Sequence, residues 1–240
     1  MEGYNKIRKA VEIHTDISDE KRERDHYDLD RVSTSEYFKL HPKWEKGIKT
    51  FFGKLHEKGE GVAHVDICGR TDARSLGSDV SYCFSLKASD IRKSAADKST
   101  IFIDGDIFNP NDFDLLIKRL KEDGVSPALV TFEPVAGLQS HFPEFKKEVP
   151  MYEKVTYGQL EKRFRQIINI LKPGGYVYIA KPFQFLGIED FLRNKLKEEY
   201  EMSIRMKELA SEEGCTIEIS SELGGPYYLV RKPIRKHEAH

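Results

Sequence analysis

The chain has 240 residues, with 39 lysines and arginines against 40 aspartates and glutamates, so its formal net charge is −1. This balance gives no bulk attraction to nucleic acid or to an anionic membrane. No uninterrupted apolar stretch approaches the ~20 residues of a membrane helix, and the first residues lack the apolar core of a signal peptide. The three cysteines form no C-x-x-C pair, so neither a disulfide framework nor a zinc site is expected. We therefore expect a cytoplasmic protein of one α/β domain with a helical extension.

Residues 1–60 are predicted to be mostly helical and to form an N-terminal segment or lid. Apolar side chains recur in this segment at helical spacing, at Trp44, Ile48, Phe51, Phe52 and Leu55. Pro42 suits the first turn of this helix, and Gly59 suits its end. The aromatic side chains of the segment, which include Tyr37 and Phe38, have two interpretations. They either pack on the rest of the protein, which we expect, or cover a ligand.

The rest of the chain, residues 61–240, alternates short apolar runs with amphipathic stretches. Strands are predicted over 61–67, 80–86, 100–104, 127–135, 176–183, 216–223 and 227–233. Helices are predicted over 88–97, 110–124, 156–175 and 187–214. Such alternation is typical of a mainly parallel sheet with helices on both faces. Only Gly224, Gly225 and Pro226 separate the last two strands, and so short a joint requires an antiparallel hairpin. We therefore predict an α/β fold: a Rossmann-like, seven-stranded, mostly parallel sheet with a terminal antiparallel hairpin and an N-terminal helical extension.

Several stretches near the ends of the predicted strands carry a more specific pattern. They are LKPGGYVYIA (171–180), IDGDIFNP (103–110), PALVTFEPV (127–135) and the terminal hairpin. Together with the order of the predicted elements, these stretches resemble class I S-adenosylmethionine-dependent methyltransferases over residues 61–233. The resemblance implies that residues 61–240 form a methyltransferase-like Rossmann domain. It also implies that S-adenosylmethionine is the cofactor and that no metal is required.

The stretch HVDICGRTDA (64–73) lies where this family has its first cofactor loop, usually D-x-G-x-G-x-G. The family's glycines let the backbone approach the methionine end of the cofactor without Cβ clashes. Asp66 and Gly69 match this pattern and are implied to bind the cofactor, whereas Arg70 and Asp72 stand where glycines are expected. The alternative for Asp66 is that its side chain caps the following turn.

Ser85, Asp106 and Ile107 are the other cofactor-binding residues that the resemblance implies. Ser85 lies near the end of the second strand, where the family often has an acid for the ribose; here no acid comes before Asp90. Asp106 would accept the adenine amino proton, and Ile107 would pack on the ring. The alternative is that Asp104 and Asp106 form a turn and a helix N-cap.

Two candidate catalytic residues follow from the fourth predicted strand. Glu133 ends this strand in TFEPV, at the place where members of the family that methylate amino groups carry an Asn or Asp followed by two prolines and an aromatic. Only the acid and Pro134 match that pattern. His141 lies in the next loop and could be a general base, because the pKa of histidine lies near neutrality. The alternative is an inert loop histidine.

The resemblance implies a methyltransferase that moves a methyl group from a sulfonium to an oxygen or nitrogen nucleophile of a small-molecule substrate. The alternative is an inactive methyltransferase-like module for binding or structure, because the first loop has few glycines. A nicotinamide-dependent oxidoreductase is the weaker alternative, since no G-x-G-x-x-G follows any predicted strand. No nucleic-acid or membrane partner is expected, and assembly into a homo-oligomer is left open.

Overall fold

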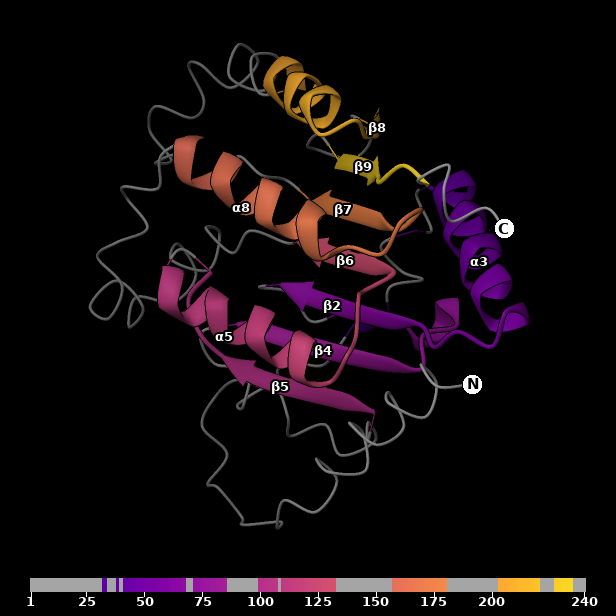
Figure 1. Ribbon diagram of the computed structural model, residues 1–240. Helices are drawn as coiled ribbons and strands as arrows, with labels where there is room; N and C mark the ends of the chain where they lie inside the picture. Colours follow the sequence, from indigo (N-terminus) through magenta and orange to yellow (C-terminus); the bar gives the residue numbers. More distant parts are fainter. Residues whose placement is uncertain are drawn as a thin grey trace.

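Figure 1 shows the computed structural model of the chain, which describes residues 32–33, 38, 41–67, 71–85, 99–107, 109–132, 157–180, 203–220 and 227–234. Its centre is a seven-stranded sheet. The strands are β2 (Ala63–Ile67), β4 (Val80–Ser85), β5 (Thr100–Asp104), β6 (Leu129–Phe132), β7 (Tyr176–Ala180), β8 (Thr216–Ser220) and β9 (Tyr227–Arg231). They lie side by side in the order β5-β4-β2-β6-β7-β9-β8.

One strand of the sheet runs against the others. The pairs from β5 through β4, β2 and β6 to β7 are all parallel. The last strand in the chain, β9, is inserted between β7 and β8 and is antiparallel to both. The predicted fold class, a mostly parallel seven-stranded sheet with an antiparallel terminal hairpin, is therefore confirmed.

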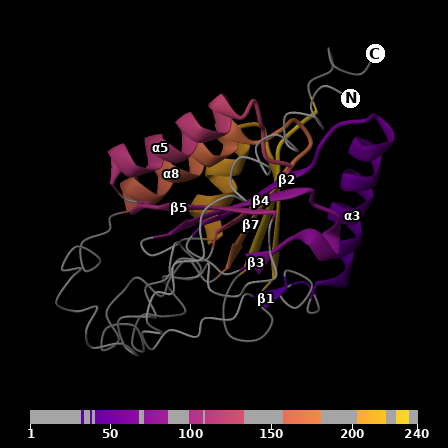
Figure 2. The same ribbon diagram turned by 90° about the horizontal axis from the view of Figure 1, so that it is seen from below.

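Helices cover both faces of the sheet. In Figure 2, α5 (Pro110–Glu122) and α8 (Tyr157–Ile170) lie on one side, and α3 (Pro42–Glu57) lies on the other, beside the end where the strands begin. These helices agree with the predicted ones, and the described part of the predicted helix 187–214 is helical over 203–212. The predicted helix 88–97 lies outside the described residues. None of the described helices is both long and apolar enough to cross a membrane.

The alternation of side chains along each strand divides the core in two. Val65 and Ile67 of β2 belong to the larger cluster, which also includes Phe113 of α5 and Phe164 of α8. The smaller cluster joins α3 to the other face of the sheet, where Tyr178 lies. Because each strand points alternate residues to opposite faces, the same short strands supply both layers.

The aromatic stripe of the N-terminal segment packs on the sheet. Phe38, Trp44, Phe51 and Phe52 are all buried in the smaller cluster. Trp44 Nε1 also donates to Glu218 Oε2 of β8 at 2.7 Å. Tyr37 lies outside the described residues, and the division of the chain at residue 60 stays a prediction.

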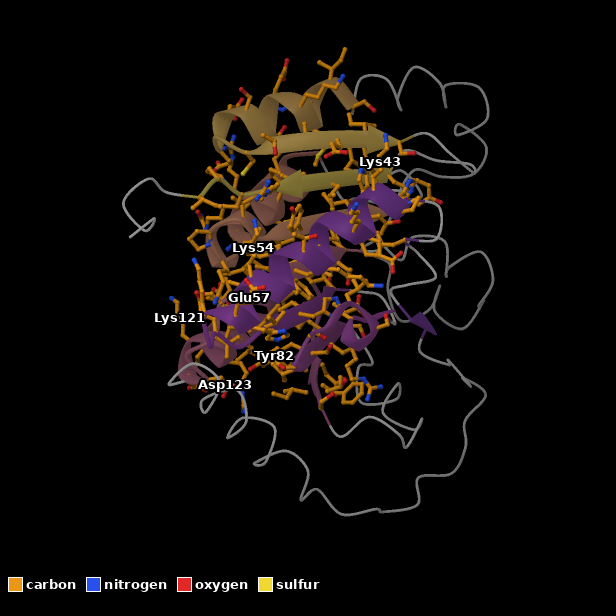
Figure 3. The ribbon with its side chains drawn as sticks, turned by 90° about the vertical axis from the view of Figure 1, so that its right-hand side faces the viewer. Lys43, Lys54, Glu57, Tyr82, Lys121 and Asp123 are labelled. Atoms are coloured by element: carbon orange, nitrogen blue, oxygen red, sulfur yellow. The ribbon has the colours of Figure 1, made fainter. Side chains whose placement is uncertain are left out.

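Charged residues line the outer side of this layer and the neighbouring end of the sheet. Lys43, Lys54 and Glu57 are exposed on α3 (Figure 3).

The hydroxyl of Tyr82, on β4, donates to Asp123 Oδ2 at the end of α5, at 2.8 Å. Burial, followed by the charge of Asp123, raises the pKa of this phenol, so Tyr82 is a neutral donor.

The turn between α8 and β7 contains the LKPGG sequence. Gly174 has a φ of 78°, a conformation that side chains other than glycine adopt at a cost. A Cβ on Gly175 would lie 2.8 Å from the carbonyl oxygen of Lys172 and 2.9 Å from that of Ala128. Tyr176 N donates to the same Ala128 oxygen at 2.9 Å. The two glycines thus let the turn lie close against the start of β6, which sets β7 beside it.

Candidate functional site

Four parallel strands end together at one edge of the sheet. This carboxyl edge consists of the C-terminal residues of β2, β4, β5 and β6, with the arrowheads of β2 and β5 pointing to the left in Figure 1. Ile67 of β2 pairs with Phe84 of β4 and Phe132 of β6, and Ser85 pairs with Asp104 of β5. Ligands of open α/β sheets bind outside the carboxyl ends of the strands. The predicted cofactor residues found at or just beyond this edge are Asp66, Ser85 and Asp106.

Asp66 lies within the sheet, one residue before the end of β2. Its side chain is fully buried, and it shares a face of β2 with His64. The hydroxyl of Thr131, on the neighbouring strand β6, donates to Asp66 Oδ1 at 2.7 Å. The Asp66 carboxylate is therefore held by a side chain of the neighbouring strand. Its role toward a cofactor stays a prediction.

Asp106 belongs to the tight turn between β5 and α5, which lies against Ser85 at the end of β4. Gly105 N donates to the carbonyl oxygen of Ser85 at 2.9 Å. Asp106 N donates to Asp112 Oδ2 at 3.0 Å, so the first turn of α5 holds the loop. A Cβ on Gly105 would lie 2.6 Å from Cε2 of the buried Phe84 ring, so the loop approaches the sheet too closely for a side chain there. The turn considered as an alternative is present, but the N-cap of α5 is Asn109 and neither Asp104 nor Asp106, and adenine binding by Asp106 stays a prediction.

Ile107 points into the protein interior. Its side chain is 1% exposed and belongs to the larger core cluster together with Phe113. Such a side chain offers little free surface to an aromatic ring. The geometry therefore supports an adenine contact of Ile107 less than it supports one of Asp106.

Three predicted site residues lie outside the described residues: Gly69, Glu133 and His141. Their roles stay predictions. The far side of the first loop is described, and there Thr71–Asp72 form the short strand β3. It pairs in parallel with β1 (Val32–Ser33). The backbone of the N-terminal segment thus lies directly beside the predicted cofactor loop, which the sequence did not indicate.

The sequence analysis missed a group of buried polar side chains next to Asp66. His64, Ser81 and Thr131 are each at most 2% exposed. His64 Nε2 lies 2.8 Å from Thr131 Oγ1, and His64 Nδ1 lies 3.3 Å from Ser81 Oγ. The available signal was the alternation His64-Val65-Asp66 in an otherwise apolar strand, because residues two apart share a face.

Arg163 of α8 was also missed. Its side chain is 3% exposed, and its Cζ lies 4.8 Å from the centre of the Phe113 ring. Burial lowers the pKa of Arg163, and the charges of Asp114 and Asp106 act in the opposite direction. The guanidinium is thus a buried positive charge on the face of the sheet that α5 and α8 cover. It interacts electrostatically with Asp106, the residue predicted to bind adenine.

No metal site is found among the described residues, since no group of three or more His, Cys, Asp or Glu is placed to hold an ion. No family model matches the chain. No curated protein matches it either.

Several solved structures that match the chain are described as methyltransferases. An O-methyltransferase family protein from Burkholderia thailandensis is 10% identical, with a TM-score of 0.44; the match covers 84% of this chain and 60% of that protein. The N-methyltransferase NodS from Bradyrhizobium japonicum, in complex with S-adenosyl-L-homocysteine, is 12% identical, with a TM-score of 0.40 over 95% and 99% of the two chains. An rRNA methylase from Streptococcus thermophilus is 10% identical, with a TM-score of 0.44 over 80% and 95%.

The strand order itself carries the assignment of the fold. Five parallel strands run from β5 to β7, and a reversed strand is inserted before the last edge strand. This is the arrangement implied by the resemblance of the LKPGG turn and the terminal hairpin. The chain has the fold of class I S-adenosylmethionine-dependent methyltransferases.

Proposed function

We propose that the protein is an S-adenosylmethionine-dependent methyltransferase that acts on an oxygen or nitrogen nucleophile of a small molecule. The observation that carries the proposal is the sheet order with β9 reversed between β7 and β8, in combination with acidic residues at the carboxyl edge. Asp66 is the next-to-last residue of β2, Asp104 is the last residue of β5, and Asp106 lies two residues beyond it. The small-molecule substrate is supported by the near-zero net charge of the chain.

The donors and acceptors at this edge suit the proposed cofactor. S-adenosylmethionine carries an ammonium group, ribose hydroxyls and an adenine amino group, all of which can donate hydrogen bonds. Carboxylates accept such bonds, and a bond to an ammonium is charge-assisted. In the proposal Asp66 holds the methionine end together with the turn at Gly69, and Asp106 holds the adenine. Ser85 lies between them on β4, near the ribose.

The protein's contribution to the chemistry is positioning. When bound, S-adenosylmethionine supplies a methyl group on a positively charged sulfur. Residues of the carboxyl edge would orient this methyl group toward the acceptor, exclude water and offset the moving charge. In the proposal Glu133 orients the acceptor atom from the tip of β6, and His141 takes up its proton.

Thermal unfolding with a panel of ligands tests the proposal. The panel is S-adenosylmethionine, S-adenosylhomocysteine, NAD and ATP. A ligand at 100 times its dissociation constant stabilises a protein by about 2.7 kcal/mol, which corresponds to a rise of roughly 5–10 °C for a chain of this size. We expect this rise with the first two ligands alone. No rise at millimolar concentrations of either would make the inactive module the better account, and a rise with NAD alone would support the oxidoreductase.

The Asp66→Asn variant tests the predicted cofactor contact. Asparagine keeps an oxygen that accepts the Thr131 hydroxyl, so we expect a similar melting temperature. The loss of the charge should lower the affinity for S-adenosylhomocysteine by about tenfold or more in calorimetry. The matched control is Asp114→Asn, which removes one exposed carboxylate from α5 and should leave the affinity unchanged. Equal affinities of Asp66→Asn and wild type would contradict the assignment of Asp66.

A further inference from the structure

A chain of polar side chains crosses the centre of the sheet and ends at Asp66. Its members lie on three adjacent strands: Ser81 on β4, His64 and Asp66 on β2, and Thr131 on β6. The register places Thr131 directly beside Asp66 and Ser81 directly beside His64. All four side chains are at most 2% exposed. Since buried polar groups must be hydrogen-bonded to be tolerated, this arrangement needs a definite placement of its protons.

The placement of the protons follows from the acceptor at the end of the chain. Thr131 Oγ1 donates its single proton to Asp66 Oδ1, so it can only accept from His64 Nε2, 2.8 Å away. His64 must therefore carry a proton on Nε2. In the neutral ring Nδ1 is then an acceptor, and the Ser81 hydroxyl, 3.3 Å away, donates to it. Each hydrogen bond among these four side chains is therefore donated in the direction of Asp66.

We propose that His64 and Thr131 are positioning residues for the cofactor site, which hold the Asp66 carboxylate charged and in one orientation at the end of β2. Hydrogen bonds that point in one direction polarise one another, and a carboxylate that accepts hydrogen bonds is favoured in its charged form. The carboxylate would thereby be fixed before any ligand arrives, which reduces the ordering cost of binding. The inference rests on the proposed function, because it assigns the role of Asp66 to the cofactor.

A role in stability alone is the competing explanation. A merely structural chain would therefore show effects on unfolding but none on ligand affinity. The two explanations differ in their consequences for Thr131, whose hydroxyl is the link between His64 and Asp66.

Thr131→Val removes this hydroxyl with little change in shape, and Thr131→Ser restores it. We expect Thr131→Val to bind S-adenosylhomocysteine about tenfold more weakly than wild type in calorimetry, with recovery in Thr131→Ser. The matched control is Thr100→Val. Thr100 is a buried threonine of β5. It pairs with Ser81 of β4, so its side chain lies on the same face of the sheet as Ser81. It should change the melting temperature without changing the affinity.

The nitrogen chemical shifts of the His64 ring provide a second measurement that is independent of the ligand. His64→Gln identifies the signals among the eight histidines of the chain. We expect a neutral ring with its proton on Nε2 in wild type and in Thr131→Ser, and a weaker preference in Thr131→Val. A proton on Nδ1 in wild type would overturn the proposed direction of the chain.

The possible failures are distinguishable. If wild type binds S-adenosylhomocysteine and Thr131→Val binds it equally well, the positioning role is wrong and the proposed function stands. If Thr100→Val weakens binding as much as Thr131→Val does, the effect is a general one of the sheet and the positioning role is again wrong. If wild type binds neither S-adenosylhomocysteine nor S-adenosylmethionine, the proposed function fails and the role of His64 and Thr131 fails with it.

Discussion

Gly175, in the turn between α8 and β7, is a position where a single methyl group should be costly. A Cβ at this residue would lie 2.8 Å from Lys172 O, 2.9 Å from Ala128 O and 3.0 Å from Leu171 Cγ. Two of these neighbours are backbone atoms, and both oxygens accept hydrogen bonds, from Gly175 N and Tyr176 N. Neither can move away without loosening the turn or the contact between β6 and β7. We therefore expect Gly175→Ala to cost about 3 kcal/mol, the upper end of the range for overpacking.

Urea unfolding and thermal unfolding measure this cost. For a protein of this size a loss of 3 kcal/mol lowers the melting temperature by roughly 6–12 °C. Gly174→Ala should cost less, about 1–2 kcal/mol for its positive φ, because its close neighbours are the side chains of Phe51 and Ile234. The matched control is Gly53→Ala in α3, where a Cβ meets nothing within 4 Å; it should stabilise the protein by about 0.5–1 kcal/mol. A melting temperature of Gly175→Ala equal to that of wild type would refute the reasoning.

Two further predictions concern charges that hold α8. Lys232 Nζ donates to the carbonyl oxygens of Ile168 and Leu171 at 2.8 and 2.7 Å. These bonds satisfy carbonyl groups at the C-terminal end of α8, so Lys232→Met should lower the free energy of unfolding in urea by about 2 kcal/mol. The control Lys207→Met, at an exposed lysine, should change it by almost nothing. Equal effects of the two substitutions would contradict the capping role of Lys232. The hydrogen bonds from Arg205 hold the pKa of Glu161 below its ordinary value, so their stabilising effect is present at neutral pH and is lost as the pH falls through that lowered pKa. The melting temperature of Glu161→Gln should therefore lie below that of wild type at pH 7. The difference should shrink as the pH falls below the ordinary pKa of a glutamate, and a difference that does not shrink in acid would contradict the assignment.

The sequence by itself determined the layout of the sheet. Short apolar runs alternating with amphipathic stretches predicted parallel strands with helices on both faces, because burial on two sides requires continuous apolar strands. The three residues between the last two strands required an antiparallel hairpin, since a parallel crossover needs about a dozen residues or more. These signals are local: each depends on spacing within one segment or on the length of one joint.

The residues at the carboxyl edge were only partly within reach of the sequence. Asp66, Ser85 and Asp106 were correctly expected near the ends of strands, because the end of an apolar run can be located to within a few residues. Their surroundings could not be predicted. Ile107 was expected to face a ligand, yet it lies in the core, because the turn after β5 directs this side chain inward.

Only the tertiary structure decided which distant residues meet. The polar chain from Ser81 through His64 and Thr131 to Asp66 depends on the register of three strands, and a shift of one residue would turn these side chains to the opposite face. The pairing of β1 with β3 places the N-terminal segment beside the first loop, and Lys232 reaches the end of α8 across more than 60 residues of sequence. Such contacts follow from how the packed elements lie against one another, and no spacing within a single segment records them.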